Sequence, residues 1–335
     1  MNRSRFRARG LGTRRMRLLI LPLLFVLGAR MAPAQEVAAP EYAVQAPLAF
    51  RSLTLDAATA DGALVAVGGR GHILVSEDGG ETWRQAEVPT RAALTGVFFH
   101  DRKLGWVVGH DAMILRTTDG GDTWEVVHSA PEEESPLFDV WFADTDNGFA
   151  IGAYGSFYRT SDGGKSWSFD PISEDDFHLH HVARADDGRL YIAAEAGLVY
   201  RSDDGGATWT EIPSPYTGSF FATLPLEGDS LLLFGLRGHL FRSDDAGESW
   251  EELETGTVAM LTDGLVLADG TILITGLGGV TLVSDDGGHS FDPLQQSSRR
   301  GISAVVEASE DSLLLVGEFG VRTLPLADLA GRKDR

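Results

Sequence analysis

The sequence of 335 residues contains no cysteine. This absence excludes disulfide bonds, thiolate metal ligands and a lipid anchor attached through cysteine. The sequence also lacks any run of about 20 apolar residues, the length that an α-helix needs to span a bilayer. Glycine is abundant instead, with 40 residues, which indicates many tight turns.

Acidic residues are missing from residues 1–34, which hold eight arginines. A basic stretch ending at Arg17 precedes an apolar run over 18–27, and Ala32-Pro33-Ala34 follows with the small residues of a cleavage site. This pattern predicts a secretory signal peptide over 1–34 and therefore a periplasmic or secreted protein. The Arg14-Arg15 pair leaves the twin-arginine route open beside ordinary secretion.

After residue 34 the balance of charge reverses. This part holds all 49 acidic residues but 20 of the 28 basic residues, a formal net charge of −29. Such a surface argues against nucleic acids and anionic lipids as partners. It favours solubility, or attraction to a basic partner surface.

One short motif recurs six times. Each copy reads (S/T)-x-D-x-G-x-(S/T) followed by Trp or Phe, and the terminal aromatic residues are 41, 43, 42, 41 and 41 residues apart. The motif resembles the Asp-box of bacterial neuraminidase repeats, in which the aspartate accepts backbone N–H bonds across a turn. A calcium loop is the alternative, but the glutamate at its twelfth position and its flanking helices are not found. The predicted structural residues are Asp78 and Trp83, Asp119 and Trp124, Asp162 and Trp167, Asp204 and Trp209, Asp245 and Trp250, and Asp286 and Phe291.

Four strand-like segments accompany each motif. In the second repeat they are Leu94–Phe99, Gly105–Gly109, Met113–Arg116 and Thr123–Val127. Alternating β-branched and aromatic residues bounded by Gly and Asp are typical of strands. Four strands in about 41 residues predict one blade of a β-propeller.

The last repeat has three strands but neither an Asp-box nor a fourth strand. The spare extended segment Glu41–Pro47 is expected to supply that outer strand and close the ring. We therefore predict an all-β, seven-bladed β-propeller of four-stranded antiparallel blades over residues 48–326. Residues 35–47 form its N-terminal segment and closing strand, and residues 327–335 form a C-terminal tail. A six-bladed ring is the alternative.

The candidate binding residues lie in the turns between second and third strands and in the loops between blades. In a four-stranded meander these connections share the face opposite the Asp-boxes. A turn without another task favours Asn, Asp or Gly, so larger side chains there indicate a surface that meets a partner. The predicted partner-binding residues are Arg70, His110, Asp111, Tyr154, Glu195, Arg237, Arg299, Arg300, Glu318 and Phe319.

A histidine cluster raises the question of a metal. His178 and His180 share one side of a strand, whereas His181 is expected to face the other. With Asp175 or Asp176 nearby, zinc or copper ligation is conceivable, but no second histidine pair completes a site. We predict no metal and no cofactor, with these histidines flanking the channel as ordinary polar residues.

The segment Val108–Trp124, VGHDAMILRTTDGGDTW, resembles the photosystem II stability/assembly factor family and its non-photosynthetic bacterial relatives. The resemblance covers Phe50 to Leu324. It implies a non-catalytic assembly or accessory factor that binds a membrane-protein complex outside the cytoplasm. In the non-photosynthetic branch it implies components of RND-type transporters as partners. We expect a monomer, with Arg70, Arg237, Arg299 and Arg300 as the basic candidates for contact.

A sialidase-like glycosidase or a glycan-binding propeller is the main alternative. Sialidases clamp a carboxylate with three arginines, use a Tyr–Glu nucleophile pair and carry an (F/Y)RIP motif. The nearest string here is Phe50-Arg51-Ser52-Leu53, which lacks the Ile-Pro. The sequence therefore predicts that the protein is not an enzyme.

Overall fold

The computed structural model describes residues 41–295 and 298–330, in which strands β1 to β27 follow one another and α1 (Ala327–Ala330) is the one α-helix. The predicted signal peptide over 1–34, residues 35–40 and the end of the predicted tail over 331–335 lie outside these residues. Within the described part, we find no helix with the length and apolar character needed to cross a bilayer.

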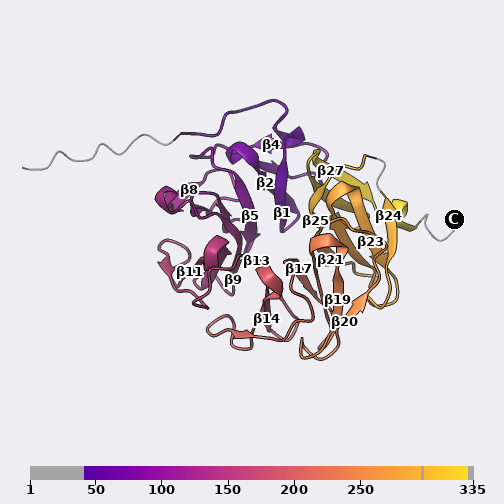
Figure 1. Cartoon of the computed structure of the whole chain (residues 1–335). Helices are drawn as coiled ribbons and strands as arrows, with labels where there is room; N and C mark the ends of the chain where they lie inside the picture. The colour runs from indigo at the N-terminus through magenta and orange to yellow at the C-terminus, as the bar shows by residue number, and fades with distance from the viewer. Residues whose placement is uncertain (1–40, 296–297, 331–335) are drawn as a thin grey trace, which may run out of the picture. The chain divides into compact units, whose positions relative to one another are not determined.

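Consecutive strands pair in antiparallel sheets, one sheet for each repeat. The sheets stand as blades around a central axis (Figure 1), so the predicted seven-bladed β-propeller is confirmed. The strands of the first three blades are β1 (Thr54–Ala60), β2 (Ala63–Gly68), β3 (Ile73–Ser76) and β4 (Arg84–Gln85); β5 (Leu94–Phe99), β6 (Gly105–Gly109), β7 (Met113–Thr117) and β8 (Glu125–His128); and β9 (Leu137–Phe142), β10 (Gly148–Gly152), β11 (Phe157–Thr160) and β12 (Ser168–Phe169).

The next three blades repeat this pattern, and the seventh has three described strands. The first strands of neighbouring blades contact one another around the ring, including β25 with β1. These inner strands line the central channel. The strands of the last four blades are β13 (Leu179–Arg184), β14 (Leu190–Ala194), β15 (Val199–Ser202) and β16 (Thr210–Glu211); β17 (Phe220–Pro225), β18 (Leu231–Gly235), β19 (Leu240–Ser243) and β20 (Glu251–Leu253); β21 (Leu261–Val266), β22 (Ile272–Gly276), β23 (Val280–Ser284) and β24 (Asp292–Gln295); and β25 (Ile302–Ser309), β26 (Ser312–Gly317) and β27 (Gly320–Pro325).

The prediction that Glu41–Pro47 supplies the outer strand of the seventh blade is wrong. Among the described residues the seventh sheet has three strands, and the segment Glu41–Pro47 lies beside the outer edge of the first blade. Ala43 N donates to Val88 O at 2.9 Å, and the side-chain oxygen of Gln85 accepts the N–H of Ala46 at 2.9 Å. The Gln85 amide also donates to Val44 O, so its side chain holds the segment at two points. The ring closes through side-chain packing of the seventh blade on the first.

Each gap between blades is filled by its own apolar cluster. The aromatic residue that ends each Asp-box packs between its blade and the preceding one; Trp124, for example, is 7% exposed and lies among residues of the first and second blades. The aromatic residues of all six Asp-boxes lie at such seams between blades. The seam between the sixth and seventh blades contains Leu329 of α1 instead, at 5% exposure. The propeller therefore includes the start of the predicted tail.

Candidate functional site

The Asp-boxes are self-contained turns between third and fourth strands. In the first, Asp78 Oδ1 accepts Thr82 N at 2.9 Å and Ser76 Oγ at 2.8 Å, while Oδ2 accepts the Thr82 hydroxyl at 2.5 Å. Hydrogen bonds from the hydroxyl and the backbone N–H of Thr82 lower the pKa of Asp78 to about 2, which keeps it ionised. The same pattern recurs at Asp119, Asp162, Asp204, Asp245 and Asp286.

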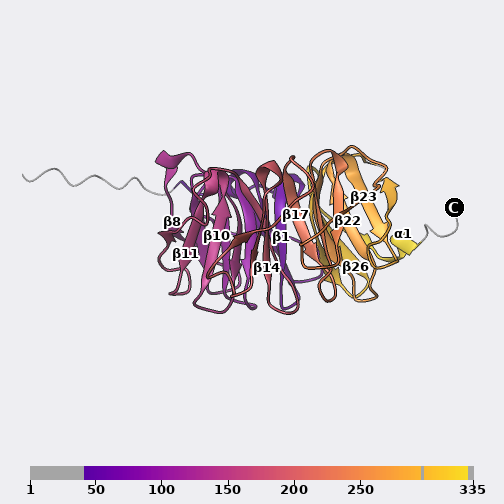
Figure 2. The same ribbon diagram turned by 60° about the horizontal axis from the view of Figure 1, so that its bottom comes forward.

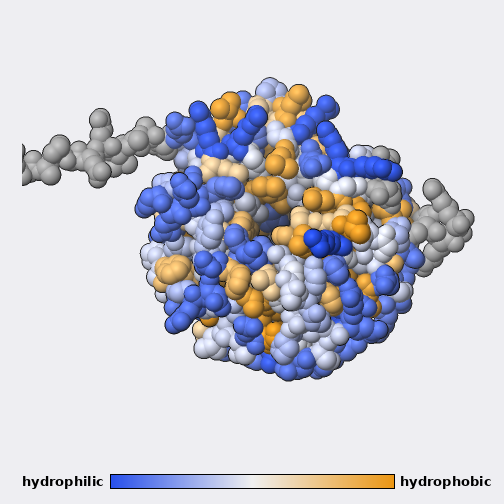
Figure 3. Space-filling model, viewed as in Figure 1, coloured by the Kyte–Doolittle hydropathy of each residue, from blue (hydrophilic) through white to orange (hydrophobic). Residues whose placement is uncertain are grey.

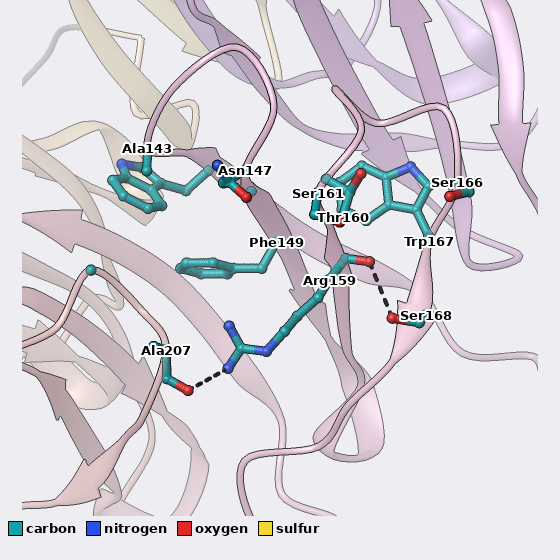
Figure 4. Close-up of a pocket in the computed structure, with 13 residues that line it drawn as sticks. Ala143, Asn147, Phe149, Arg159, Thr160, Ser161, Ser166, Trp167, Ser168 and Ala207 are labelled. Carbon is teal, nitrogen blue, oxygen red and sulfur yellow. Dashed lines mark hydrogen bonds between the residues drawn. The ribbon is translucent and has the colours of Figure 1, made fainter.

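A cavity of about 550 Å³ lies beside the third Asp-box, with Trp141, Phe149, Arg159 and Trp167 among its walls (Figure 4). The guanidinium group of Arg159 already has partners within the fold. Arg159 Nε donates to Asp170 at 2.6 Å, and a terminal nitrogen donates to Gly206 O at 2.5 Å. The same position in other blades behaves alike, since Arg116 reaches Gly163 O and Arg242 reaches Gly287 O. These arginines therefore join neighbouring blades.

The opposite face carries the turns between second and third strands. In Figure 2 the short helical turns gather along the upper edge of the ring. Each turn packs against the loop that leads from its own blade to the next; Gly155 N, for example, donates to Phe177 O at 2.9 Å. The turns are η2 (Gly69–Gly71), η4 (Ala153–Gly155), η5 (Glu195–Gly197), η6 (Leu236–Gly238) and η7 (Leu277–Gly279), with His110–Ala112 and Glu318–Gly320 at the equivalent places.

Several of these turns hold a large side chain in the left-handed conformation. The φ angles are 63° at Arg70, 54° at Tyr154 and 60° at Arg237, and Asp111 has a φ of 64°. This conformation costs about 1 kcal/mol for a residue with a Cβ, and glycine would adopt it freely. Ala196 and Gly278 hold the equivalent positions with φ angles of 57° and 68°, so these turns share the left-handed conformation and differ in the side chain that they present.

The predicted residues share this face but do not form one patch. Arg70 follows β2 and Arg237 follows β18, and these blades lie on different sides of the channel (Figure 1). Arg299 and Arg300 are exposed in the loop before β25, with a φ of 47° at Arg299. Glu318 accepts the N–H of Gly301 at 2.9 Å, which ties the last turn to that loop. His110 is exposed and Phe319 is half-buried.

Tyr154, His178 and Glu195 do form a cluster across the third and fourth blades. The ring centroids of Tyr154 and His178 are 5.0 Å apart, and His178 Nδ1 lies 2.6 Å from Glu195 Oε2. Glu195 also accepts the His178 N–H, and these bonds hold the pKa of Glu195 below its usual value. Tyr154 is 59% exposed, so its ring is presented to solvent on a fixed support.

The expectation that His181 faces away from His180 is wrong. A β-bulge between Leu179 and His181 interrupts the alternation of β13, and both His180 and His181 line the central channel. The same bulge occurs in the first strand of every blade. Its bulged residues form a ring around the channel, which consists of Leu55, Thr95, Phe138, His180, Phe221, Thr262 and Ser303.

Three carboxylates in the channel escaped the sequence analysis. Asp56, Asp139 and Asp263 each follow a bulged residue and accept a backbone N–H from the next blade at 2.8 Å, from Val97, Val182 and Val305 respectively. Burial, reinforced at Asp56 by the charge of Asp139, raises the pKa of each to about 7. One feature of the sequence could have indicated these residues. Each is an aspartate inside a mostly apolar alternating strand, as in the FDVWF stretch of β9.

His178 and His180 have hydrogen bonds within the fold. His180 Nδ1 contacts Phe220 O at 2.7 Å, and burial lowers the pKa of His180 to about 4. The rings of His178 and His180 are 6.1 Å apart. In the part of the chain that the structure describes, no three His, Asp or Glu side chains converge closely enough to hold one metal ion.

The sequence matches a known protein family over most of its length. A family model described as photosynthesis system II assembly factor YCF48 matches residues 81–135 and 130–321. The chain belongs to this family. Two curated YCF48-family relatives match one short stretch each. One is the photosystem II assembly protein Ycf48 of Thermosynechococcus vestitus, 44% identical over 43 residues, 13% of this chain and 12% of the relative. The other is the chloroplastic photosystem II stability/assembly factor HCF136 of Cyanidioschyzon merolae, 42% identical over 48 residues, 14% of this chain and 11% of the relative.

Solved structures share the fold over most of the chain. YCF48 bound to D1 peptide has a TM-score of 0.68 and 21% identity, with 87% of this chain and 96% of that chain covered. YCF48 from Cyanidioschyzon merolae has a TM-score of 0.67 and 18% identity, with coverage of 84% and 98%. An enzyme, streptogramin B lyase, reaches a TM-score of 0.70 at 13% identity, with coverage of 84% and 96%. The fold alone therefore does not separate a binding protein from an enzyme.

Proposed function

We propose that this protein is a non-catalytic scaffold that binds a membrane-protein complex through the face opposite the Asp-boxes. The observation that carries the proposal is the set of turns in which Arg70, Tyr154 and Arg237 keep large side chains in a left-handed conformation. Membership of the YCF48 family supports an assembly role, and one relative is described as bound to D1 peptide.

The finer proposal concerns place and partner. The signal-peptide pattern over 1–34 supports export to the periplasm, where the protein would meet the outer domains of inner-membrane complexes. We propose components of an RND-type transporter as the partner, because the resemblance to the non-photosynthetic branch implies them. A soluble glycan, bound or hydrolysed, is the competing ligand class.

Capture from solubilised membranes tests this proposal. The protein, tagged at its C-terminus, is incubated with detergent-solubilised envelope and the recovered proteins are identified by mass spectrometry. We expect an inner-membrane complex, and Arg70→Glu with Arg237→Glu should reduce its recovery at least fivefold with an unchanged unfolding midpoint. Equal recovery would place the contact elsewhere.

A pair of exposed apolar positions sharpens the test. Tyr154 is 59% exposed on the proposed binding face, and Val126 is 42% exposed on the outer strand β8. Tyr154→Ala should weaken capture, whereas Val126→Ala should not. If the wild type recovers nothing specific, a glycan array and a sialidase assay decide between the glycan alternatives.

A further inference from the structure

The central channel has an acidic wall and an aromatic mouth. It encloses a cavity of about 390 Å³, and none of its described lining residues is Lys or Arg. Asp56, Asp139 and Asp263 contribute its carboxylates, from the first, third and sixth blades. Figure 3 shows a hollow at the centre of the ring, with apolar residues along part of its rim.

The carboxylates retain acceptor capacity. Each uses one oxygen for the next residue's N–H and the other for the neighbouring blade, as Asp139 does with Val140 and Val182. A carboxylate offers about four lone-pair positions, so two hydrogen bonds leave it able to accept more from the channel. Burial in the channel makes an opposite charge there more favourable than at the surface.

His181 is a second and independent feature of the same wall. Its Nδ1 is shielded from solvent and has no hydrogen-bond partner among the described residues, and its ring interacts electrostatically with Asp263. Burial lowers the pKa of His181, which favours the neutral ring. A neutral imidazole accepts a hydrogen bond at its unprotonated nitrogen, so a ligand that donates N–H groups would satisfy it.

The aromatic rings at the entrance of the channel favour an organic cation. His180 and Phe221 have ring centroids 4.8 Å apart, and Phe138 lies 5.8 Å from His180, so three rings border the entrance on the proposed binding face. Aromatic faces attract ammonium and guanidinium groups. Because the described carboxylates are too dispersed to ligate one metal ion, a longer cation that donates several hydrogen bonds fits better.

We infer that the channel receives a basic side chain, Lys or Arg, from the protein partner. The charge of −29 after residue 34 would attract a basic segment, and the carboxylates and His181 of the channel would accept hydrogen bonds from its side chain. The inference rests on the proposed function, since it assigns the chemistry of the partner that docks on this face.

A hexalysine peptide is the probe, because it presents the cation without the partner. Methyl NMR of the purified protein follows Val97, Val140, Val182 and Val305 in the channel wall, with Val126 on the outer strand β8 as the reference. We expect hexalysine, but not hexaglutamine, to shift the channel methyls. Asp139→Asn should weaken that binding at least fivefold, whereas the control Glu254→Gln, which removes an equal charge from an exposed site, should not.

A second variant keeps the test decisive if Asp139→Asn folds poorly. Phe221→Lys places an ammonium group at the mouth while it retains all three carboxylates, so hexalysine should no longer shift the channel methyls. Shifts at Val126 alone, or channel shifts insensitive to Phe221→Lys, would overturn the inference.

The capture experiment tests the proposed function separately from the inference about the basic side chain. Intact capture without hexalysine binding in the channel would refute only the basic side chain. Hexalysine binding by a protein that captures no complex would refute the proposed function and leave a cation site.

Discussion

At the scale of single residues, the same residue type has opposite roles on two sides of the molecule. Asp78 in an Asp-box accepts a hydroxyl and a backbone N–H in an exposed turn, and its pKa falls to about 2. Asp139 in the channel accepts two backbone N–H groups, but burial raises its pKa to about 7. Desolvation outweighs hydrogen bonding at Asp139, whereas hydrogen bonding dominates at Asp78.

The raised pKa of Asp139 predicts that this residue makes the folded protein less stable as the pH rises. Between about pH 4 and pH 7 the unfolded chain releases a proton that the folded protein keeps, so the contribution of Asp139 to stability falls as the pH rises. Above about pH 7 the cost is constant. Asp139→Asn removes the titrating group, so the wild type should lose stability relative to the variant from pH 4 to pH 7. One pKa unit corresponds to about 1.4 kcal/mol.

Urea unfolding at a series of pH values measures this difference. Asp78→Asn is the control with the opposite sign, because a lowered pKa stabilises the folded state above about pH 4 and that stability is lost toward pH 2. Parallel curves for the wild type and Asp139→Asn would show that Asp139 titrates normally.

At the scale of elements, the Asp-box forms a turn and also supplies an aromatic side chain to the seam between two blades. The aspartate organises the turn, and the aromatic residue that follows it enters the gap to the preceding blade. Trp124 contacts Phe99 edge to face, with ring centroids 6.1 Å apart, inside the cluster between the first and second blades. Short-range turn chemistry and long-range packing therefore come from the same eight residues.

Truncation of Trp124 should be strongly destabilising. Trp124→Ala removes a large side chain that is 7% exposed, and comparable buried aromatic residues cost about 3 to 5 kcal/mol. Denaturant unfolding measures the change. Phe169→Ala, at a 57% exposed position, is the control and should cost much less. An unchanged midpoint for Trp124→Ala would mean that the seam does not depend on its indole.

At the scale of the whole molecule, the ring closes without a shared strand. The seventh blade contributes three described strands and meets the first blade through a cluster that includes Leu64, Leu314 and Trp83. The seam between the sixth and seventh blades has no Asp-box aromatic residue because the seventh repeat has no Asp-box. Leu329 of α1 packs there instead.

The helix α1 should therefore contribute to the stability of the ring. Leu329→Ala is expected to cost about 2 to 4 kcal/mol, since the side chain is buried between two blades. Thermal unfolding of Leu329→Ala and of the exposed neighbour Asp328→Ala provides the comparison. If both variants melt with the wild type, α1 is a tail as the sequence predicted.

The sequence by itself determined the repeat and many strand limits. Leu94–Phe99 and Gly105–Gly109 have the predicted bounds, because alternation and turn residues act within a few positions. The Asp-box residues follow for the same reason, since each box is closed by local hydrogen bonds.

Only the tertiary structure decided the place of Glu41–Pro47 and the make-up of the channel. The side chain of Gln85, about 40 residues away in the sequence, selects the first blade for that N-terminal segment. The bulge in each inner strand breaks the two-residue alternation, so it turns His180 and His181 to the same channel. Asp56, Asp139 and Asp263 meet there because seven strands, separated in the chain, converge on one axis. Pairing over such distances depends on the packing of whole blades, which no local pattern encodes.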